Sequence, residues 1–494
     1  MLKKILCTLM ASLLLAASLT ACANGDQSPA DTSPDAQTQA NTDPNAESRE
    51  SLDIPDERYD GTELCFLTRD GGSWSTVEIF TDTKTSEADN ISYAVFERND
   101  RILQDYGVTV TEIKESNQQS KTTNEVAAPT GDFQVVITDV RTSATLATGG
   151  YLWDLRSDAI DAIDLTKSWW DIKMAEGMSI DGHLFFATGD LQTLDNDATF
   201  AIMFNKTLAT QSNLPNLYEL VDNGNWTMNQ LYTLEQQTVQ DLDGNGTLSY
   251  LNDVLGFAYT DDVPSCLLIA GGVTMCKKDG DDIPYYAMDV DRAQSVAEKI
   301  RLCFTRDYTV NLSDVSGDIE EVGKKCFGEN HSLFFGECLQ CVTRLRGYDV
   351  DFGIVPYPKY NEEQSSYYSM MHHIASMVSI PKSIREKDLL MVESMVEAMA
   401  YHSVDTLTKQ YYEINLKTKG AKDAESGPMI DTILANRACD LAYYFNWGTG
   451  AFENFSVCLS PSSTTSVASM SQRFKSSVTT SISKDLKKFA ALAP

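Results

Sequence analysis

The first third of the chain alternates short apolar runs with a helical stripe, and this alternation constrains the fold most. Residues 63–67 form an apolar run expected to be a buried strand. Residues 91–106 then carry apolar side chains at helical spacing, and Gly107 ends that stripe. Short apolar runs return at 108–113 and 133–137. Strands that alternate with helices predict a parallel sheet of the α/β class.

The rest of the chain continues in the same manner. With 494 residues, it is too long for one small core, so we expect two or more lobes. Residues 179–186 predict a hairpin with an Asp-Gly turn, and Thr227 is a plausible helix cap. Of the pair Trp169 and Trp170, we expect one side chain to be packed and the other exposed. Further strands are predicted at 201–206, 332–337, 351–358 and 374–380, and helices at 293–304, 389–399, 432–445 and 471–492.

The start of the chain has the charged, apolar and small-residue order of a secretory signal. Lys3 and Lys4 precede an apolar run over residues 5–17, which is shorter than the ~20 residues of a spanning helix. Residues 19–22, Leu-Thr-Ala-Cys, resemble the lipobox of bacterial lipoproteins. The resemblance implies that Cys22 is cleaved free, acylated (palmitate is a typical chain) and left as the first mature residue. An ordinary signal peptide with a chance Cys nearby is the alternative.

We therefore divide the N-terminal region into a signal peptide, residues 1–21, and a lipidated tether, residues 22–56. The tether is rich in Asp, Ser, Thr, Pro, Asn, Gln and Ala, with few large apolar side chains. This composition does not offset the entropy lost on ordering, so we expect disorder. The folded body would then be held by lipid at the extracytoplasmic face of the cell membrane.

Charge and cysteine content exclude some classes of protein. A formal net charge of -32 repels phosphate backbones and argues against nucleic-acid binding. Eleven cysteines are present, and an odd number remains without Cys7 and Cys22, so a full set of disulfides within one chain is impossible. Cys338 and Cys341 form a lone CxxC without a second pair, which favours buried free thiols over a zinc or redox site.

A loop at residues 241–253 has the spacing of an EF-hand-like calcium site. Oxygen ligands occupy its positions 1, 3, 5 and 9, and Gly246 occupies position 6. Position 12 is Asn252 rather than Glu, so Asp253 is expected to close the loop. A polar turn without metal is the alternative. The predicted ligands of a structural Ca²⁺, the one cofactor considered, are Asp241, Asp243, Asn245, the carbonyl of Thr247, and Asp253.

The order of several stretches resembles the family 1 extracellular solute-binding proteins, the lipoprotein receptors of carbohydrate ABC importers. The stretches are residues 163–171 with the Trp pair, 182–190, 203–206, 241–257 with Gly256-Phe257, and 332–359 with Phe334-Phe335-Gly336 and Ile354-Val355-Pro356-Tyr357-Pro358. The match covers nearly all of the mature body. It is carried by the order and spacing of the stretches together rather than by any single one.

This resemblance implies a periplasmic-binding-protein-like α/β fold with two discontinuous lobes and a hinge. One lobe would comprise residues 57–190 and 356–420, and the other 191–355 and 421–494. The implied function is that of a monomeric receptor, not an enzyme. It captures a carbohydrate, expected to be an oligosaccharide, in the cleft between the lobes and delivers it to the permease subunits of an ABC transporter.

A sugar cleft needs carboxylates for hydroxyl edges and aromatic side chains for the flat C–H faces of the sugar. Such residues are expected in loops that follow strands, where α/β sheets bind ligands. His372 and His373 lie near a predicted crossover, but a histidine there is more often structural. The candidate ligand-binding residues are Trp74, Asp139, Asp190, Asp197, Glu337 and Trp447.

Two other classes of function remain open. A secreted lipoprotein glycoside hydrolase would use paired carboxylates, and 71 acidic residues make such pairs uninformative. The chain contains no GxSxG or HExxH motif. A sugar sensor or adhesin that keeps the receptor fold without transport is the second alternative.

Overall fold

A computed structural model describes residues 50–72, 74, 77–82, 90–315, 319–420 and 424–492, without the side chains of 319–320 and 413–420. The predicted signal peptide, Cys22 and most of the predicted tether lie outside the described residues. None of the helices in the described part of the chain combines the length and apolarity that crossing a bilayer requires.

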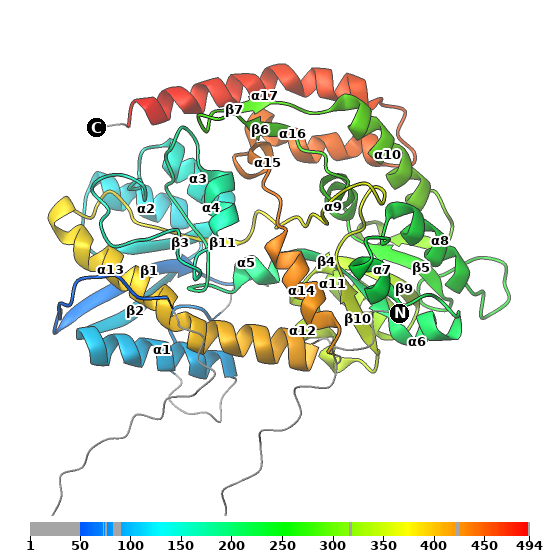
Figure 1. Cartoon of the computed structure of the whole chain (residues 1–494), viewed down its shortest axis with the longest axis horizontal. Helices are drawn as coiled ribbons and strands as arrows, with labels where there is room; N and C mark the ends of the chain where they lie inside the picture. The colour runs from blue at the N-terminus through cyan, green and yellow to red at the C-terminus, as the bar shows by residue number, and fades with distance from the viewer. Residues whose placement is uncertain are drawn as a thin grey trace, which may run out of the picture. The chain divides into compact units, whose positions relative to one another are not determined.

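The first sheet is built from the alternating runs of the N-terminal third and one later strand (Figure 1). Its strands, in spatial order, are β11 (Ser376–Ser379), β3 (Val135–Asp139), β1 (Thr62–Arg69) and β2 (Val108–Glu115). β1 runs parallel to both β2 and β3, whereas β11 is antiparallel to β3. The predicted parallel α/β sheet is confirmed, with an antiparallel strand at one edge. Around it lie α1 (Asn90–Tyr106), α2 (Gln118–Ala127), α3 (Val140–Thr148) and α13 (Glu386–Ser403). The π-helix η3 (Val404–Gly420) packs against α1 and α13.

The chain passes from β1 to β2 on one side and later to β3 on the other, so the strand order reverses at β1. Such a reversal leaves a crevice at the carboxyl ends of the two inner strands, here β1 and β3. Both faces of β1 are buried, since Leu64 and Phe66 pack into one hydrophobic cluster and Cys65 and Leu67 into another. A run buried on both faces is typical of a parallel sheet.

The second sheet has five strands and also buries both faces. In spatial order they are β10 (Phe352–Val355), β4 (Phe200–Asn205), β9 (Ser332–Cys338), β5 (Leu255–Tyr259) and β8 (Thr309–Asn311). β5 is parallel to β8 and β9, and β4 is antiparallel to both of its neighbours. Its helices are α6 (Lys206–Gln211), α7 (Leu217–Asp222), α8 (Met228–Thr238), α9 (Val263–Ala270), α10 (Val290–Phe304), α11 (Ile319–Gly328) and α12 (Gln340–Arg344), with the 3₁₀ turns η1 (Leu312–Asp314) and η2 (Leu345–Gly347).

Three segments between the sheets pair with one another; we call residues 190–199, 369–375 and 436–440 the crossover segments. Thr199 forms an antiparallel bridge with Met371, and Ser369 forms a parallel bridge with Arg437. The amide of Phe200 donates to the carbonyl of Met370, also within this ribbon (2.9 Å). The connections between the two sheets are therefore hydrogen-bonded to each other and do not run separately.

The remaining elements flank these segments. They are α4 (Ile172–Met178), α5 (Leu194–Asp197), the ribbon of β6 (Cys276–Lys278) and β7 (Pro284–Tyr286), and α14 (Ser426–Ala435), α15 (Leu441–Tyr444), α16 (Trp447–Phe455), η4 (Ser456–Leu459) and α17 (Val467–Ala490). Figure 1 shows α17 in red along α16, and α17 packs against α10 beside the second sheet and α3 beside the first. The C-terminal helix thus contacts elements of both lobes.

Several local predictions are confirmed and others are wrong. Ile180 and His183 pair around the predicted Asp-Gly turn, and Thr227 caps α8 by accepting from the amide of Gln230. The single helix predicted over 432–445 is instead two helices, because residues 436–440 form a crossover segment. All nine cysteines in the described part of the chain are free, and all but Cys439 are buried.

The predicted tether extends too far toward the folded body. Leu52 and Ile54 pack against the hydrophobic cluster of the first lobe, and Lys167 bonds the carboxylate of Asp53 (2.8 Å). The composition of residues 22–56 as a whole is polar, but these two apolar side chains are two residues apart and cover the lobe. The boundaries assigned to the two lobes remain a prediction.

Trp169 and Trp170 are both buried, which contradicts the prediction that one would be exposed. Their indole N–H groups donate to the two carboxylate oxygens of Glu397 on α13, at 2.9 and 2.8 Å. Burial raises the pKa of Glu397 to about 7, and the two indole donors oppose that shift. One carboxylate therefore satisfies both indoles in the interior.

Replacing Glu397 by Gln is expected to lower the free energy of unfolding by about 1–3 kcal/mol, because the amide nitrogen would face an indole N–H and leave it unpaired. The control Glu363→Gln, at an exposed position, should change the free energy of unfolding by less than about 0.5 kcal/mol. Urea denaturation of both variants measures the difference. Equal stability of the two variants would contradict the role given to Glu397.

Candidate functional site

The carboxyl ends of β1 and β3 bring two oppositely charged side chains together. Arg69 ends β1 and Asp139 ends β3, with Arg69 Nη2 3.8 Å from Asp139 Oδ2. Asp139 also caps α3, since its oxygens accept from the amide and the hydroxyl of Thr142 at 3.0 and 2.7 Å. About a quarter of the surface of the Asp139 side chain stays exposed. The predicted ligand residue Asp139 thus lies at the crevice.

A cavity of about 380 Å³ opens at this edge, and we call it the edge pocket. It lies where the strand order reverses, beside the N-termini of α2 and α3, so its walls are mostly polar. Such a position is the usual ligand site of an open α/β sheet. The edge pocket is lined by Arg69, Asp70, Ser116, Asn117, Gln118, Gln119, Asp139, Thr142 and Ile374.

Trp74 lines a smaller cavity that shares Arg69 with the edge pocket. Trp74 is half-buried, and its ring is nearly parallel to that of His372, with centroids 6.0 Å apart. The ring of His373 stacks on that of Tyr443, with centroids 5.6 Å apart and an interplanar angle of 11°. Trp74 thus lies near polar groups, and its role as a ligand contact stays a prediction.

The two crossover histidines, given a structural role in the sequence interpretation, lie at the centre of this region. Their Nδ1 atoms are 3.2 Å apart. Burial, reinforced by Arg141 and Arg69, lowers the pKa of His372 to about 4. Burial, the neighbouring His372 and the same arginines lower the pKa of His373 to about 3. At neutral pH both imidazoles are uncharged, so each has one nitrogen that donates and one that accepts.

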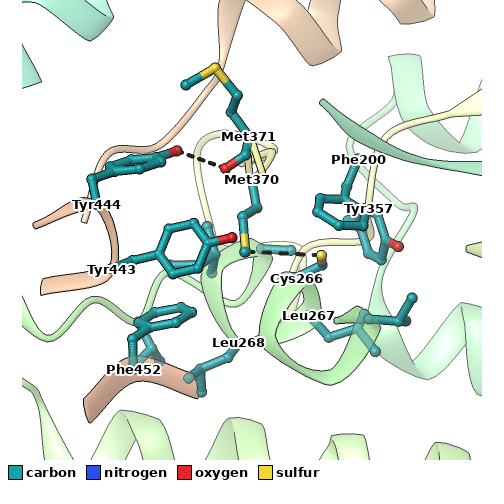
Figure 2. Packing of buried hydrophobic residues seen from close by; sticks show 14 of the residues in the cluster. Phe200, Cys266, Leu267, Leu268, Tyr357, Met370, Met371, Tyr443, Tyr444 and Phe452 are labelled. Carbon is teal, nitrogen blue, oxygen red and sulfur yellow. Dashed lines mark hydrogen bonds between the residues drawn. The ribbon is translucent and has the colours of Figure 1, made fainter. Parts of the chain in front are cut away.

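Arg141 on α3 connects the first lobe to the C-terminal helices. Its Nε and Nη2 atoms donate to the carbonyl of Tyr443 at 3.2 and 3.1 Å, and its guanidinium lies 5.0 Å from the centre of the Tyr443 ring. It also forms an ion pair with Glu453 on α16. Figure 2 shows Tyr443 beside Phe452 and directed toward Met370 and Cys266. The hydroxyl of Tyr443 accepts from the amide of His373 (3.2 Å).

The second lobe contributes acidic groups at the carboxyl ends of its own strands. Asp262 follows β5, and Glu337 lies near the end of β9. Burial raises the pKa of Glu337 to about 7, and burial also raises the pKa of Asp262, which Arg141 opposes. Because Arg141 acts on Asp262, the charges of the two lobes influence each other here. The hydroxyl of the fully buried Tyr357 has no hydrogen-bond partner among the described residues.

Three other residues that were predicted to contact the ligand do not line the edge pocket. Asp190 accepts from the hydroxyl of Thr408 (3.0 Å), and buried Asp197 accepts from the hydroxyl of Tyr411 (2.6 Å), so both face η3. Burial raises the pKa of Asp197 to about 7. Trp447 is 2% exposed and donates to Asp485 on α17 (2.8 Å), which makes it part of the core in this conformation.

Three carboxylates of the loop predicted to bind calcium lie close together, and metal binding stays a prediction. Carboxylate oxygens of Asp241, Asp243 and Asp253 lie within 4.8 Å of one another. Buried Asp253 accepts from the amides of Leu242 (2.8 Å) and Ser249 (2.7 Å), so it is fixed from inside the loop. Asn245 bonds Asp243 and the amide of Thr247 in the same turn. This donor set is the all-oxygen type that Ca²⁺ prefers.

Comparison with solved structures assigns the fold. An ABC substrate-binding protein of Listeria monocytogenes in complex with cycloalternan matches with a TM-score of 0.52 and 11% identity, over 86% of this chain and all of the other. A maltose/maltodextrin-binding domain, MalE, of Bdellovibrio bacteriovorus bound to maltotriose gives 0.53 and 12%, over 85% and 100%. UgpB of Mycobacterium tuberculosis in complex with glycerophosphocholine gives 0.53 and 16%, over 81% and 95%.

The chain has the two-lobed fold of ABC substrate-binding proteins. The fold expected from the family 1 resemblance is thereby confirmed. No family model and no curated protein matches the sequence. In this fold the edge pocket and the acidic groups of the second lobe occupy the carboxyl ends of both sheets.

Sequence interpretation missed several residues of the site. Arg69 and Asp262 directly follow or end a strand, so the rule that selected Asp139 could also have selected them. Arg141 lies two residues beyond Asp139, so the same rule could have selected it. Tyr443 carried no such signal, because its proximity depends on the packing of α15 against α3.

The histidine pair should make stability fall on mild acidification. Their folded pKa values lie below the ordinary 6.5, so the unfolded chain binds protons first as the pH drops. The stability that the neutral pair provides is complete above about pH 6.5 and is lost progressively below it. As the pH falls from about 7 to about 5, the wild type should therefore lose more free energy of unfolding than the double variant His372→Gln/His373→Gln does. A difference between the two proteins that stays constant over this range would contradict the burial argument.

Proposed function

We propose that the protein is a membrane-anchored extracellular solute receptor that captures a carbohydrate between its lobes and delivers it to an ABC permease. The observation that carries the proposal is the convergence of polar and aromatic side chains from both lobes at the carboxyl ends of the two sheets. Arg69, Asp139 and Trp74 belong to the first lobe, and Asp262 and Glu337 to the second. The hydroxyl groups of a sugar would form hydrogen bonds with the carboxylates and the guanidinium, and its C–H faces would stack on the aromatic rings.

Charge pairing favours a neutral ligand. Arg69 faces Asp139, and Arg141 forms an ion pair with Glu453. A phosphate-bearing ligand such as the one named for the Mycobacterium protein would compete with these carboxylates, whereas sugar hydroxyls would not. Two of the three neighbours carry carbohydrates, cycloalternan and maltotriose, which supports an oligosaccharide as the ligand class.

Binding without catalysis is part of the proposal. A glycoside hydrolase is the second candidate function. Glu337, whose pKa is raised to about 7, would suit its general acid, and the neighbouring Asp262 would suit its second carboxylate. Glu337 accepts from the amide of Cys338 (2.8 Å), so one of its oxygens is already engaged. Release of reducing ends from a bound oligosaccharide, abolished in Glu337→Gln, would establish the hydrolase in place of the receptor.

A thermal-shift screen across oligosaccharides should identify a ligand that raises the melting temperature. Replacing Asp139 by Asn should then weaken its binding about tenfold, through loss of a charge-assisted hydrogen bond. Asn is also a good helix cap, so α3 should remain intact. Trp74→Ala should weaken binding by a similar or larger factor. The control Asp222→Asn, on the exposed end of α7, should bind as the wild type does in calorimetry. Unchanged affinity in both site variants would refute the site.

We also propose that Cys22 carries the lipid anchor. The Cys22→Ala protein should leave the membrane fraction, since one signal-peptide segment of this length does not span the bilayer. Cys7→Ala, inside the predicted signal peptide, is the matched control and should stay in that fraction. Fractionation followed by immunoblotting measures both, and a membrane-bound Cys22→Ala protein would overturn the anchor.

We further propose that the loop of Asp241, Asp243, Asn245, Thr247 and Asp253 holds a structural Ca²⁺ far from the ligand. Adding calcium to chelated protein at about millimolar concentration, the weak end of such sites, should raise the melting temperature. Asp241→Asn/Asp243→Asn should abolish the rise. The pair Asp279→Asn/Asp281→Asn, in another exposed acidic turn, should retain it. No response in the wild type would remove the calcium proposal.

A further inference from the structure

The small cavity that Trp74 lines lies at the carboxyl ends of β1 and β3, and we call it the recess. Its walls come from β1, β2, β3 and β11, from Trp74 and from residues 78–79. Its volume is about 20 Å³, against about 380 Å³ for the edge pocket. A cavity of about 10–15 Å³ is enough to hold one water molecule. The recess therefore accepts a single water-sized group and excludes a sugar ring.

Glu78 offers one carboxylate oxygen to the recess. The residue is 6% exposed. Its Oε1 atom accepts from the amides of Thr193 and Leu194 at 2.7 and 2.6 Å, and from the hydroxyl of Thr193 at 3.2 Å. Within the described ranges Oε2 has no hydrogen-bond partner, yet it keeps accessible surface, so a group in the recess can reach it. The three bonds to Oε1 hold Oε2 in place.

Ser376, the first residue of β11, supplies a second open group. It is also 6% exposed and lines the recess. Its hydroxyl forms no hydrogen bond in the part of the chain that the structure describes, and it too keeps accessible surface. A serine hydroxyl both donates and accepts. Two side chains that are more than nine-tenths buried thus leave a polar atom available to the same water-sized cavity.

The charges around the recess favour a neutral occupant. Glu112 is its second carboxylate, and the hydroxyl of Thr68 donates to Glu112 Oε1 (2.6 Å). Two guanidinium groups balance the carboxylates, because Arg69 lines the recess and Arg98 donates to the backbone carbonyl of Glu78 (2.8 Å). An anion would meet two carboxylates and a cation two guanidinium groups, so either would add an unmatched charge to a buried position.

A hydroxyl group satisfies these constraints. Burial raises the pKa of the Glu78 carboxyl, and the amides of Thr193 and Leu194 oppose that rise. In its ionised form the carboxylate only accepts, so the occupant must donate to Oε2. A hydroxyl is neutral, has the size of water, and can donate to Oε2 of Glu78 while it accepts from Oγ of Ser376. An ether oxygen has no hydrogen to donate.

We propose that the recess selects ligands of the receptor by accepting one projecting hydroxyl group. The hydroxyl donates to Oε2 of Glu78 and accepts from Oγ of Ser376, and the carbon that carries it packs on the ring of Trp74. This inference rests on the proposed function, and it adds Glu78 and Ser376 to the candidate ligand contacts. A ligand with a carboxylate or a methyl ether at that position would be rejected.

Ethylene glycol and 1,2-dimethoxyethane test the recess without a known oligosaccharide. Both have a two-carbon body between two oxygens, but only the diol donates hydrogen bonds. Nuclear magnetic resonance of the full protein with ¹⁵N-labelled tryptophan follows their binding, up to about 1 M because such small molecules bind weakly. Ethylene glycol should shift the indole signal of Trp74 saturably, and 1,2-dimethoxyethane should not. The signal of Trp226, a fully buried indole bonded to the carbonyl of Pro356, should stay in place with both.

Glu78→Gln is the discriminating variant. Its amide oxygen can still accept from Thr193 and Leu194, while its NH₂ group donates into the recess where the carboxylate accepted. The preference for ethylene glycol over 1,2-dimethoxyethane should therefore fall about tenfold or more. A role of Glu78 in stability alone would not change the order of the two probes. The control Glu63→Gln, exposed at the other end of β1, should keep the wild-type preference.

Two results would overturn the inference: no saturable shift of Trp74 with ethylene glycol, or an unchanged preference in Glu78→Gln. Failure of the proposed function looks different, because ethylene glycol would then bind in the recess although no oligosaccharide raises the melting temperature. An oligosaccharide whose affinity depends on Asp139 but is unchanged in Glu78→Gln would remove the recess alone and leave the receptor function standing.

Discussion

Three crossover segments pair with one another and join the two sheets. The segments bridge at Thr199–Met371 and at Ser369–Arg437, and the guanidinium of Arg437 ties the third segment to Asp195 on the first. The segments run between the sheets, so their pairing ties the connections of the two sheets together. Arg141 of the first lobe therefore lies close enough to Asp262 of the second to lower the pKa of its carboxyl against the effect of burial, although the two residues are distant in the sequence.

Burial sets the charge of the region between the lobes. It lowers the pKa of the histidines and raises the pKa of Glu337, so both kinds of group move toward their neutral forms. The two arginines keep their charge and are matched by carboxylates. The outcome is a site of many hydrogen-bonding groups and little net charge. That balance suits an uncharged ligand with many hydroxyls better than an ion.

Local spacing was sufficient for much of the fold. The runs at 63–67 and 133–137 became inner strands because their apolar residues are buried on both faces, and the helical stripe at 91–106 became α1. The rule that ligands bind after strands selected Asp139, and the loop spacing selected Asp253. Each of these inferences depends on neighbours close in sequence.

The errors arose where the partner is distant in sequence. Trp169 and Trp170 are both buried because Glu397, more than 200 residues away, accepts from both indoles. The ligand roles of Trp447 and Asp197 stay predictions, but both side chains have distant partners: Asp485 accepts from the Trp447 indole, and Tyr411 donates to Asp197. A loop residue with a suitable side chain resembles a ligand contact until the element that covers it is known.

We propose that the two lobes close over a ligand at the carboxyl ends of both sheets. Closure requires that the ligand bind the closed form more tightly than the open one. Small-angle X-ray scattering of the protein with and without a tight-binding oligosaccharide tests this most directly. A smaller radius of gyration is expected for the wild type at a ligand concentration about ten times its Kd, and a smaller decrease is expected in Asp139→Asn, which binds about tenfold more weakly. An unchanged radius in the wild type, with the ligand bound in the edge pocket, would contradict it.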